Sequence, residues 1–214
     1  MAIAELKSES LLEYCKAQSA EDSPVLKELE KYTWEQEDIP QMISGVMVGN
    51  VLQSIIFMTG AVRIVEVGMF TGYSALKMAE ALPENGEVHT CELMEKHVKT
   101  AESFFKKSPH GKKITIHQGP AVQSLEQMKV HSFDMGFIDA DKTNYLEYYK
   151  RCLTLIKPGG VLILDNMLWG GDVLDPHDDD AWALRKTAEF IQEDKRVFNI
   201  LLPIRDGLML CIKK

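Results

Sequence analysis

The chain has 214 residues, of which 45% are hydrophobic and 26% are charged, so it is long enough for one α/β domain with a sizeable core. Its formal net charge of −8 argues against a nucleic-acid backbone as the main partner, because phosphate binding needs a basic surface. The first residues mix charges with apolar side chains, so we expect no signal peptide, and we expect no later apolar run to span a membrane.

The four cysteines are Cys15, Cys91, Cys152 and Cys211, and they form no CxxC pair and no zinc-ligand spacing with a histidine. Cys91 and Cys211 fall inside apolar runs, where a free cysteine behaves as a small hydrophobic residue. We therefore expect reduced, buried thiols and a cytoplasmic protein.

Residues from about 4 to 58 are expected to be helical. Asp22 and Ser23 come directly before Pro24, and proline suits the first turn of a helix, so a helix is predicted to begin there. An apolar face of helical period then runs from Met42 to Ile56.

From residue 62 onward the pattern predicts alternating strands and helices. Strands are predicted at 63–68, 86–93, 113–118, 133–139 and 161–166, with helices at 73–82, 95–107, 121–128, 144–156 and 178–194. The segment 157–160, Lys-Pro-Gly-Gly, is expected to end one helix, and the last two apolar runs flank Arg205–Asp206–Gly207, which predicts a hairpin. We expect a single domain over 1–214, with an N-terminal helical segment at about 1–58 and a core sheet at about 62–214.

This alternation predicts an α/β fold with a mainly parallel, Rossmann-like sheet that carries helices on both faces and a C-terminal antiparallel hairpin. In such sheets ligands bind beyond the carboxyl ends of the strands. Glu92, Asp139 and Asp165 each end a predicted strand, so their side chains are expected to meet in one crevice.

The stretch "VEVGMFTGYS" indicates a nucleoside site. Gly68 and Gly72 follow a strand and precede a helix, and Glu92 stands 24 positions after Gly68, where an acid can accept hydrogen bonds from ribose hydroxyls. The dinucleotide fingerprint G-x-G-x-x-G is absent, so S-adenosylmethionine, which lacks a pyrophosphate, fits better than a nicotinamide cofactor. Glu66, inside the first strand, is expected to hold the glycine loop or the methionine amino group.

Asp139, Asp165 and Asn166 offer two carboxylates and an amide oxygen at the ends of neighbouring strands. These hard donors suit Mg²⁺, Mn²⁺ or Ca²⁺. Lys142 follows three residues after Asp139, and a lysine partly desolvated beside a cation releases its proton more readily, so Lys142 is a candidate general base. Helix capping is the competing interpretation of these acids, and it is favoured for Asp141 and for Asp178–Asp180.

The stretches "VEVGMFTGYSALKMAEALPENGEV", "FIDADKTNYLEYY", "KPGGVLILDNMLWGGDV" and "LLPIRDGLML" resemble the cation-dependent O-methyltransferases of the caffeoyl-CoA and catechol type. The resemblance runs from about Pro40 to the C-terminus. It implies a seven-stranded class I methyltransferase fold, S-adenosylmethionine, a divalent metal that is usually Mg²⁺, and commonly a homodimer.

The resemblance also implies roles for individual positions. Positions matching cofactor contacts are Ser44, Glu66, Gly68, Met69, Ser74, Glu92, Ala121 and Asp139. Asp139, Asp165 and Asn166 match metal ligands, Asp139 and Lys142 match catalytic positions, and Met42, Trp169 and Asp206 match the substrate side.

The segment between Trp169 and the final strands is shorter than in the plant enzymes, where it helps to hold coenzyme A. A free catechol-like phenol or vicinal diol is therefore expected as the methyl acceptor, with a caffeoyl-CoA-type substrate as the alternative. A nicotinamide-dependent oxidoreductase and a non-catalytic binding protein are the remaining alternatives.

Overall fold

The computed structural model describes residues 9–214, so residues 4–8 of the predicted N-terminal helical segment lie outside the described residues. The remainder of that segment is divided into helices α1 (Glu9–Ala17), α2 (Pro24–Gln36) and α3 (Gly45–Thr59), with a short 3₁₀ turn, η2 (Pro40–Met42), before α3. The predicted start of α2 is confirmed, because Pro24 is its first residue and the Ser23 hydroxyl accepts from the Leu26 N–H at 3.3 Å.

The rest of the chain alternates strands with helices, as expected. Its elements are β1 (Arg63–Val67), α4 (Tyr73–Ala81), β2 (Glu87–Glu92), α5 (Glu95–Phe105), η3 (Gly111–Lys113), β3 (Ile114–Gln118), α6 (Ala121–Gln127), β4 (Phe133–Ile138), η4 (Lys142–Asn144), α7 (Tyr145–Leu155), β5 (Ile156–Leu164), η5 (Trp169–Leu174), α8 (Asp179–Glu193), β6 (Val197–Leu202) and β7 (Leu208–Lys213).

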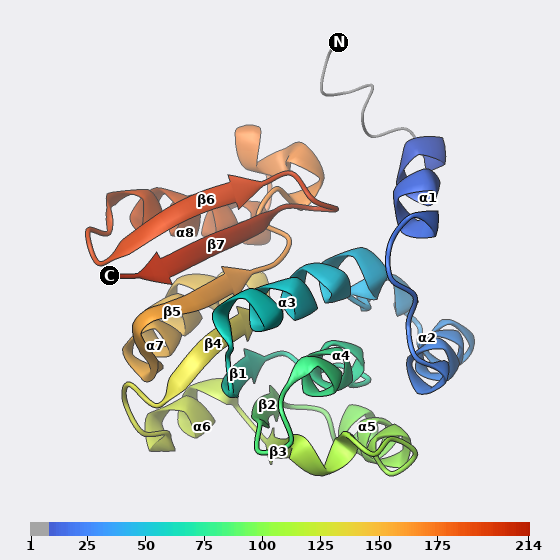
Figure 1. Cartoon of the computed structure of the whole chain (residues 1–214). Helices are drawn as coiled ribbons and strands as arrows, with labels where there is room; N and C mark the ends of the chain where they lie inside the picture. The colour runs from blue at the N-terminus through green and yellow to red at the C-terminus, as the bar shows by residue number, and fades with distance from the viewer. Residues whose placement is uncertain (1–8) are drawn as a thin grey trace.

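The strands form one seven-stranded sheet in the order β3-β2-β1-β4-β5-β7-β6 (Figure 1). The four pairs among β3, β2, β1, β4 and β5 are parallel, whereas β7 pairs antiparallel with both β5 and β6. The predicted mainly parallel sheet with a C-terminal hairpin is confirmed. The expected break at residues 157–160 is different in detail: these residues belong to β5, as an irregular stretch between the pairs Phe133–Ile156 and Met135–Val161.

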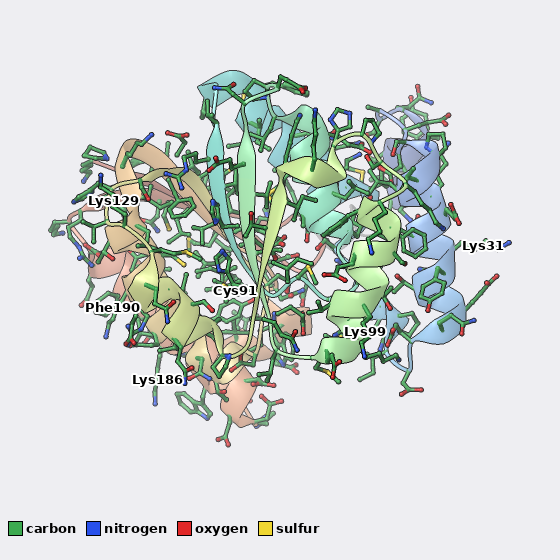
Figure 2. All side chains as sticks on the ribbon, turned by 90° about the horizontal axis from the view of Figure 1, so that it is seen from below. Lys31, Cys91, Lys99, Lys129, Lys186 and Phe190 are labelled. Carbon is green, nitrogen blue, oxygen red and sulfur yellow. The ribbon has the colours of Figure 1, made fainter. Side chains whose placement is uncertain are left out.

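Helices cover both faces of the sheet, because alternate residues of each strand point in opposite directions. In β1, for example, Ile64 joins the core on the side of α2–α5, while Val65 joins the core on the side of α6–α8. Figure 2 shows Cys91 among the central strands, with Lys31, Lys99, Lys129 and Lys186 at the periphery. All four cysteines are free; Cys91, Cys152 and Cys211 are buried, as expected, whereas Cys15 is only half-buried.

The N-terminal segment is tied to the sheet layer by a buried ion pair. Asp22 accepts from Lys77 Nζ at 2.6 Å and from the Tyr73 hydroxyl at 2.6 Å, and both partners belong to α4. Lys77 is 1% exposed, so its charge is compensated inside the protein. This contact fixes the start of α2 over α4, next to the edge of the sheet where β1 ends.

We expected no apolar run long enough to span a membrane, and that expectation is wrong. Pro40–Thr59 has enough residues and a mean hydropathy of 1.6, and 39% of its apolar window is buried. Helix α3 nevertheless packs against α4 and buries Val48, Leu52 and Ile56 in the core. Its apolar composition therefore has a role in the packing of the domain.

Candidate functional site

The carboxyl ends of β2, β1, β4 and β5 are neighbours in the sheet, and a cavity of about 1020 Å³ lies beyond them. The strand order reverses between β1 and β4, which is the position where doubly wound sheets bind ligands. The cavity is at the upper end of the usual size of small-molecule sites, roughly 300–1,000 Å³. It is large enough for a nucleoside cofactor with a small acceptor beside it.

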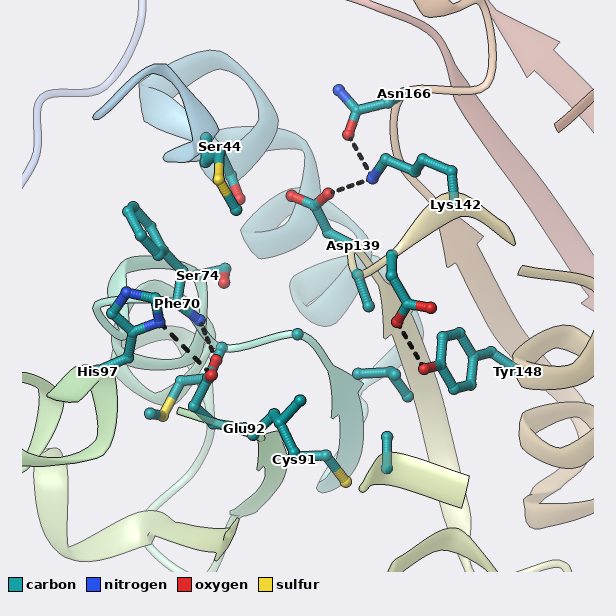
Figure 3. Close-up of a pocket in the computed structure, with 18 of the residues that line it drawn as sticks. Ser44, Phe70, Ser74, Cys91, Glu92, His97, Asp139, Lys142, Tyr148 and Asn166 are labelled. Atoms are coloured by element: carbon teal, nitrogen blue, oxygen red, sulfur yellow. Dashed lines mark hydrogen bonds and ion pairs between the residues drawn. The ribbon is translucent and has the colours of Figure 1, made fainter. Parts of the chain in front are cut away.

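Most of the residues predicted for the site line this cavity (Figure 3). They are Met42, Ser44, Gly68, Met69, Ser74, Glu92, Ala121, Asp139, Lys142, Asn166, Trp169 and Asp206. Glu66 and Asp165 are not among its lining residues, and both are buried with 0% exposure.

Gly68 allows the loop after β1 to pass close to the end of β4. Its φ angle is +93°, and a Cβ atom at this position would lie 2.0 Å from the carbonyl oxygen of Asp139. No other residue fits without moving one of the two strand ends. The loop then leads through Phe70 to Gly72, and Ser74 lies buried in the first turn of α4.

Both carboxylate oxygens of Glu92 accept hydrogen bonds from backbone N–H groups. Oε2 accepts from the Phe70 N–H and Oε1 from the Met94 N–H, each at 2.8 Å. His97 Nδ1 lies 3.5 Å from Oε1, and His97 Nε2 lies 3.5 Å from Glu37 Oε2 at the end of α2. An ionised carboxylate offers about four lone-pair positions, so Glu92 retains acceptor capacity for ribose hydroxyls.

Glu66 is paired inside the protein. Its Oε2 accepts from the Thr90 hydroxyl, whereas Oε1 is buried with no hydrogen-bond partner among the described residues. Burial raises the pKa of Glu66 to about 7, against the opposite effect of the Ser74 and Thr90 hydroxyls. The structure thus places Glu66 beneath the glycine loop, beside Ser74.

Lys142 joins Asp139 to Asn166 across the ends of β4 and β5 (Figure 3). Its ammonium donates to Asp139 Oδ1 at 3.0 Å, to Asn166 Oδ1 at 2.9 Å and to the Tyr145 hydroxyl at 2.6 Å. Three donated bonds use all the protons that an ammonium group has. Lys142 is only 8% exposed, so its position is fixed by these partners.

Asp165 has one satisfied and one unsatisfied carboxylate oxygen. Oδ1 accepts from the Asn166 N–H at 2.7 Å, while Oδ2 is buried with no partner among the described residues. Burial, together with the charge of Asp139, raises the pKa of Asp165 to about 7. A buried carboxylate oxygen without a donor is costly, and a bound cation would satisfy it.

These donors fit a divalent ion. Asp139, Asp165 and Asn166 supply only carboxylate and amide oxygens, the ligands that Mg²⁺, Mn²⁺ and Ca²⁺ prefer. Within residues 9–214 no three His, Cys, Asp or Glu side chains gather to hold a metal, so the amide of Asn166 is needed to complete a set of three. In this structure the ammonium of Lys142 donates hydrogen bonds to two of these oxygens, one on Asp139 and one on Asn166.

The capping interpretation holds for one acid and fails for another. Asp178 caps α8, since its Oδ1 accepts from the Ala181 N–H at 2.7 Å. Asp141 precedes η4 but makes no capping bond there, because its two carboxylate oxygens accept from the Tyr148 hydroxyl at 2.7 Å and from the Asn144 side-chain amide at 2.5 Å.

Strained backbone conformations gather at the cavity. Phe70, Asn166, Trp169 and Arg205 have φ angles between +47° and +57°, and all four line it. Such left-handed conformations cost an L-residue about 1–2 kcal/mol and are enriched at functional sites.

Three contributors to the site were missed in the sequence. His97 stands five residues after Glu92, and Tyr145 stands three residues after Lys142, so sequence proximity to a predicted residue was the available signal. Arg205, directly before Asp206, touches residues more than 160 positions away and had no local signal.

Comparison with known proteins supports a shared ancestry over nearly the whole chain. The sequence profile of the O-methyltransferase family matches residues 16–214. Catechol O-methyltransferase domain-containing protein 1 of Mus musculus is 36% identical over 95% of this chain and 79% of its own length, and caffeoyl-CoA O-methyltransferase 2 of Zea mays is 34% identical over 96% and 83%. The crystal structure of the O-methyltransferase from Bacillus cereus in complex with S-adenosylhomocysteine superposes with a TM-score of 0.87 at 30% identity, covering 94% of this chain and 96% of that one.

Proposed function

The chain belongs to the O-methyltransferase family, and from that premise we propose that it transfers the methyl group of S-adenosylmethionine to a catechol-like or vicinal-dihydroxy small molecule with the help of a divalent cation. One arrangement carries this proposal. Lys142 bridges Asp139 and Asn166, which line the cavity, and Asp165, next to Asn166 in the chain, has a buried carboxylate oxygen without a partner among the described residues.

The half of the cavity around β1 and β2 suits the cofactor. Glu92 would accept from the ribose hydroxyls, and the backbone bonds from Phe70 and Met94 fix its orientation before the cofactor arrives. Gly119–Val122 would border the adenine, consistent with the place of Ala121 in the wall. S-adenosylmethionine supplies an electrophilic methyl group on a sulfonium centre.

The half around β4 and β5 suits the ion and the acceptor. Asp139, Asp165 and Asn166 would hold a divalent cation, which supplies stabilisation of the negative charge on the reacting oxygen. Trp169 and Met42 both line the cavity with apolar surface, and the Trp169 ring centre lies 5.8 Å from Lys142 Nζ, so an aromatic acceptor can pack against it.

Lys142 is the proposed general base. It can accept a proton only after losing one, and its three present partners all accept hydrogen bonds from it. The base role therefore requires the oxygens of Asp139 and Asn166 to be engaged by another cation. The hydroxyl proton then passes to Lys142 Nζ, and the acceptor oxygen attacks the methyl carbon in line, so that the O–C bond forms as the C–S bond breaks and S-adenosylhomocysteine leaves. Positioning of the two reactants is expected to supply most of the rate gain.

A screen of catechols and hydroxylated aromatic acids with radiolabelled S-adenosylmethionine tests the proposal. Each acceptor is assayed with Mg²⁺, with excess EDTA, and with Mg²⁺ restored after EDTA. We expect labelled methyl on one of two adjacent hydroxyls, lost in EDTA and regained with Mg²⁺. Full turnover in chelator, or turnover only with monohydroxy acceptors, contradicts the proposal.

Caffeoyl-CoA belongs in the same screen, because the name of the Zea mays relative refers to it. Turnover of caffeoyl-CoA far above that of free caffeate would favour the thioester as the acceptor. Turnover of free catechols at least as fast would favour the smaller acceptor proposed here.

A further inference from the structure

The turn between β6 and β7 carries an arginine in a conformation that favours glycine. Arg205 has a φ angle of +52°, and Gly207, two residues later, has +95°. The Gly207 N–H donates to the Ile204 carbonyl at 2.9 Å, so the turn is tight and its backbone conformation is set locally. A glycine at position 205 would adopt this conformation without strain. The side chain of Arg205 must therefore make interactions that offset the backbone strain.

That contribution is a contact with the opposite wall of the cavity. Arg205 Nη1 donates to the Ser44 carbonyl and Nη2 donates to the Gln41 carbonyl, each at 2.7 Å. Among the side chains of residues 10–214 no carboxylate forms an ion pair with this guanidinium, and its hydrogen bonds go to these two backbone oxygens. Its charge also acts on the Asp165 carboxyl and lowers the pKa of that group, against the larger effect of burial. Hydrogen bonds from a charged donor are stronger than those between neutral groups.

The next residue of the turn holds the other wall. Asp206 Oδ1 accepts from the Gly170 N–H at 2.7 Å, and the Asp206 carbonyl accepts from the Leu168 N–H at 2.8 Å. Trp169, between these two contacts, lies in the cavity wall. Consecutive residues of one turn therefore hold two separate walls: the segment 41–44, which contains Met42 and Ser44, and the segment 168–170, which contains Trp169.

We propose that Arg205 is a positioning residue that holds the segment 41–44 at a fixed distance from the Trp169 wall, and that it thereby sets the size of acceptor that the cavity admits. The inference rests on the proposed function in one respect, that the acceptor binds at this end of the cavity. Ile43, 4% exposed, is the anchor of the segment to the core. Without Arg205, the backbone on either side of Ile43 loses two bonds, and the segment is held there by the backbone bonds of η2, from the Met42 N–H to Ile39 and from the Ile43 N–H to Pro40.

The variants Arg205→Gly and Arg205→Lys test this role. Glycine removes the side chain and also the left-handed strain, so the melting temperature is expected to stay the same or rise. Lysine retains the charge but lacks the planar fork that reaches two carbonyls at once. Arg196→Lys is the matched control, since Arg196 lies at the far end of β6 and pairs with Asp194.

Hydrogen–deuterium exchange of the amides of residues 41–46 is the readout that does not depend on turnover. Arg205→Gly is expected to speed this exchange by about tenfold or more, through local opening of the segment, while Arg196→Lys leaves it unchanged. Exchange at wild-type rates in Arg205→Gly overturns the proposal. If Arg205→Gly fails to fold, Arg205→Lys decides, with faster exchange supporting the proposal and unchanged exchange overturning it.

Acceptor kinetics test the consequence for selectivity. For Arg205→Gly we expect the KM of a small catechol to rise about tenfold, because the acceptor end of the cavity is less well ordered, with kcat little changed. The ratio of kcat/KM for a bulky 4-substituted catechol over that of catechol is expected to increase. An unchanged ratio contradicts the selectivity role. A wild-type enzyme that is inactive with every diol contradicts the proposed function instead. In that case the hydrogen-exchange result still decides the positioning role.

Discussion

The ammonium of Lys142 lies 3.0 Å from Asp139 Oδ1, so the proposed base and one of the proposed metal ligands are in direct contact. Asn166 Oδ1 lies 2.9 Å from the same nitrogen. This ion pair is largely shielded from water, since the two side chains are 9% and 14% exposed. Ion binding and proton transfer are therefore expected to be coupled, because a divalent ion and the Lys142 ammonium would compete for the same oxygens.

Replacing Lys142 separates catalysis from cofactor binding. Lys142→Met removes the proton acceptor but keeps the apolar stem of the side chain, so kcat is expected to fall by about 10²–10⁴-fold, the usual contribution of a general base. The Kd for S-adenosylhomocysteine, measured by calorimetry, is expected to remain near wild type because Glu92 lies on the other side of the cavity. The control Lys129→Met alters an exposed lysine. A variant with unchanged kcat across neutral pH would remove Lys142 from the mechanism.

Asp165 gives a test of the metal site that needs no substrate. Its unpartnered Oδ2 is expected to become satisfied when Mg²⁺ or Mn²⁺ binds, and a ligand that binds only the folded state at 100 times its Kd adds about 2.7 kcal/mol of stability. The melting temperature of the wild type should therefore rise with added metal, and Asp165→Asn should lose most of this rise. Asp175→Asn, at a side chain that is 89% exposed, should respond as wild type does. An equal response of Asp165→Asn and wild type would rule out Asp165 as a ligand.

The sequence predicted the elements at the site better than it predicted their contacts. Asp139 and Asn166 were expected to meet because parallel strand ends meet at one edge, and Lys142 joins them there. Whether a side chain faces the cavity or the interior depends on the exact residue at which the strand ends. That is why Glu66 and Asp165, both assigned to the site, are buried and are not among the residues that line the cavity.

Long-range contacts had no signal in the sequence. Arg205 reaches Gln41 across 164 positions, and nothing near either residue indicates the other. The connection of His97 to Glu37 likewise depends on the packing of α2 against the rest of the domain. Periodicity specifies which residues share a face of one element, whereas these contacts depend on how separate elements pack.

Glu92 is expected to control cofactor affinity. In Glu92→Gln the amide nitrogen replaces one oxygen and cannot accept from the Phe70 or Met94 N–H. The new NH₂ group donates where a carboxylate oxygen accepted, so a ribose hydroxyl of the cofactor loses its acceptor. At about 1–3 kcal/mol for this loss, the Kd for S-adenosylhomocysteine should rise by about 5- to 150-fold. Calorimetric titration measures this change, with Glu95→Gln as a control at a side chain that is 66% exposed. Equal affinities in Glu92→Gln and wild type would show that the cofactor does not use this carboxylate.

Glu66 should make the stability of the fold depend on pH. Burial raises its pKa from the usual 4.5 to about 7 in the folded protein, so between these values the folded state holds a proton that the unfolded chain has released. The unfolding free energy is therefore expected to fall as pH rises through this window, by up to about 3 kcal/mol from this residue alone. Glu66→Gln cannot ionise and retains an acceptor for the Thr90 hydroxyl.

Urea denaturation at pH 5 and pH 8 measures the effect of Glu66. The Asp165 carboxyl also has a pKa near 7, but it titrates in both proteins and cancels in the difference between Glu66→Gln and wild type. Glu66→Gln should therefore gain stability relative to wild type as the pH rises, whereas Glu87→Gln, at a side chain 53% exposed, should show no such gain. Parallel pH profiles of Glu66→Gln and wild type would mean that Glu66 has the same pKa folded and unfolded, because only a difference between these two values makes stability depend on pH.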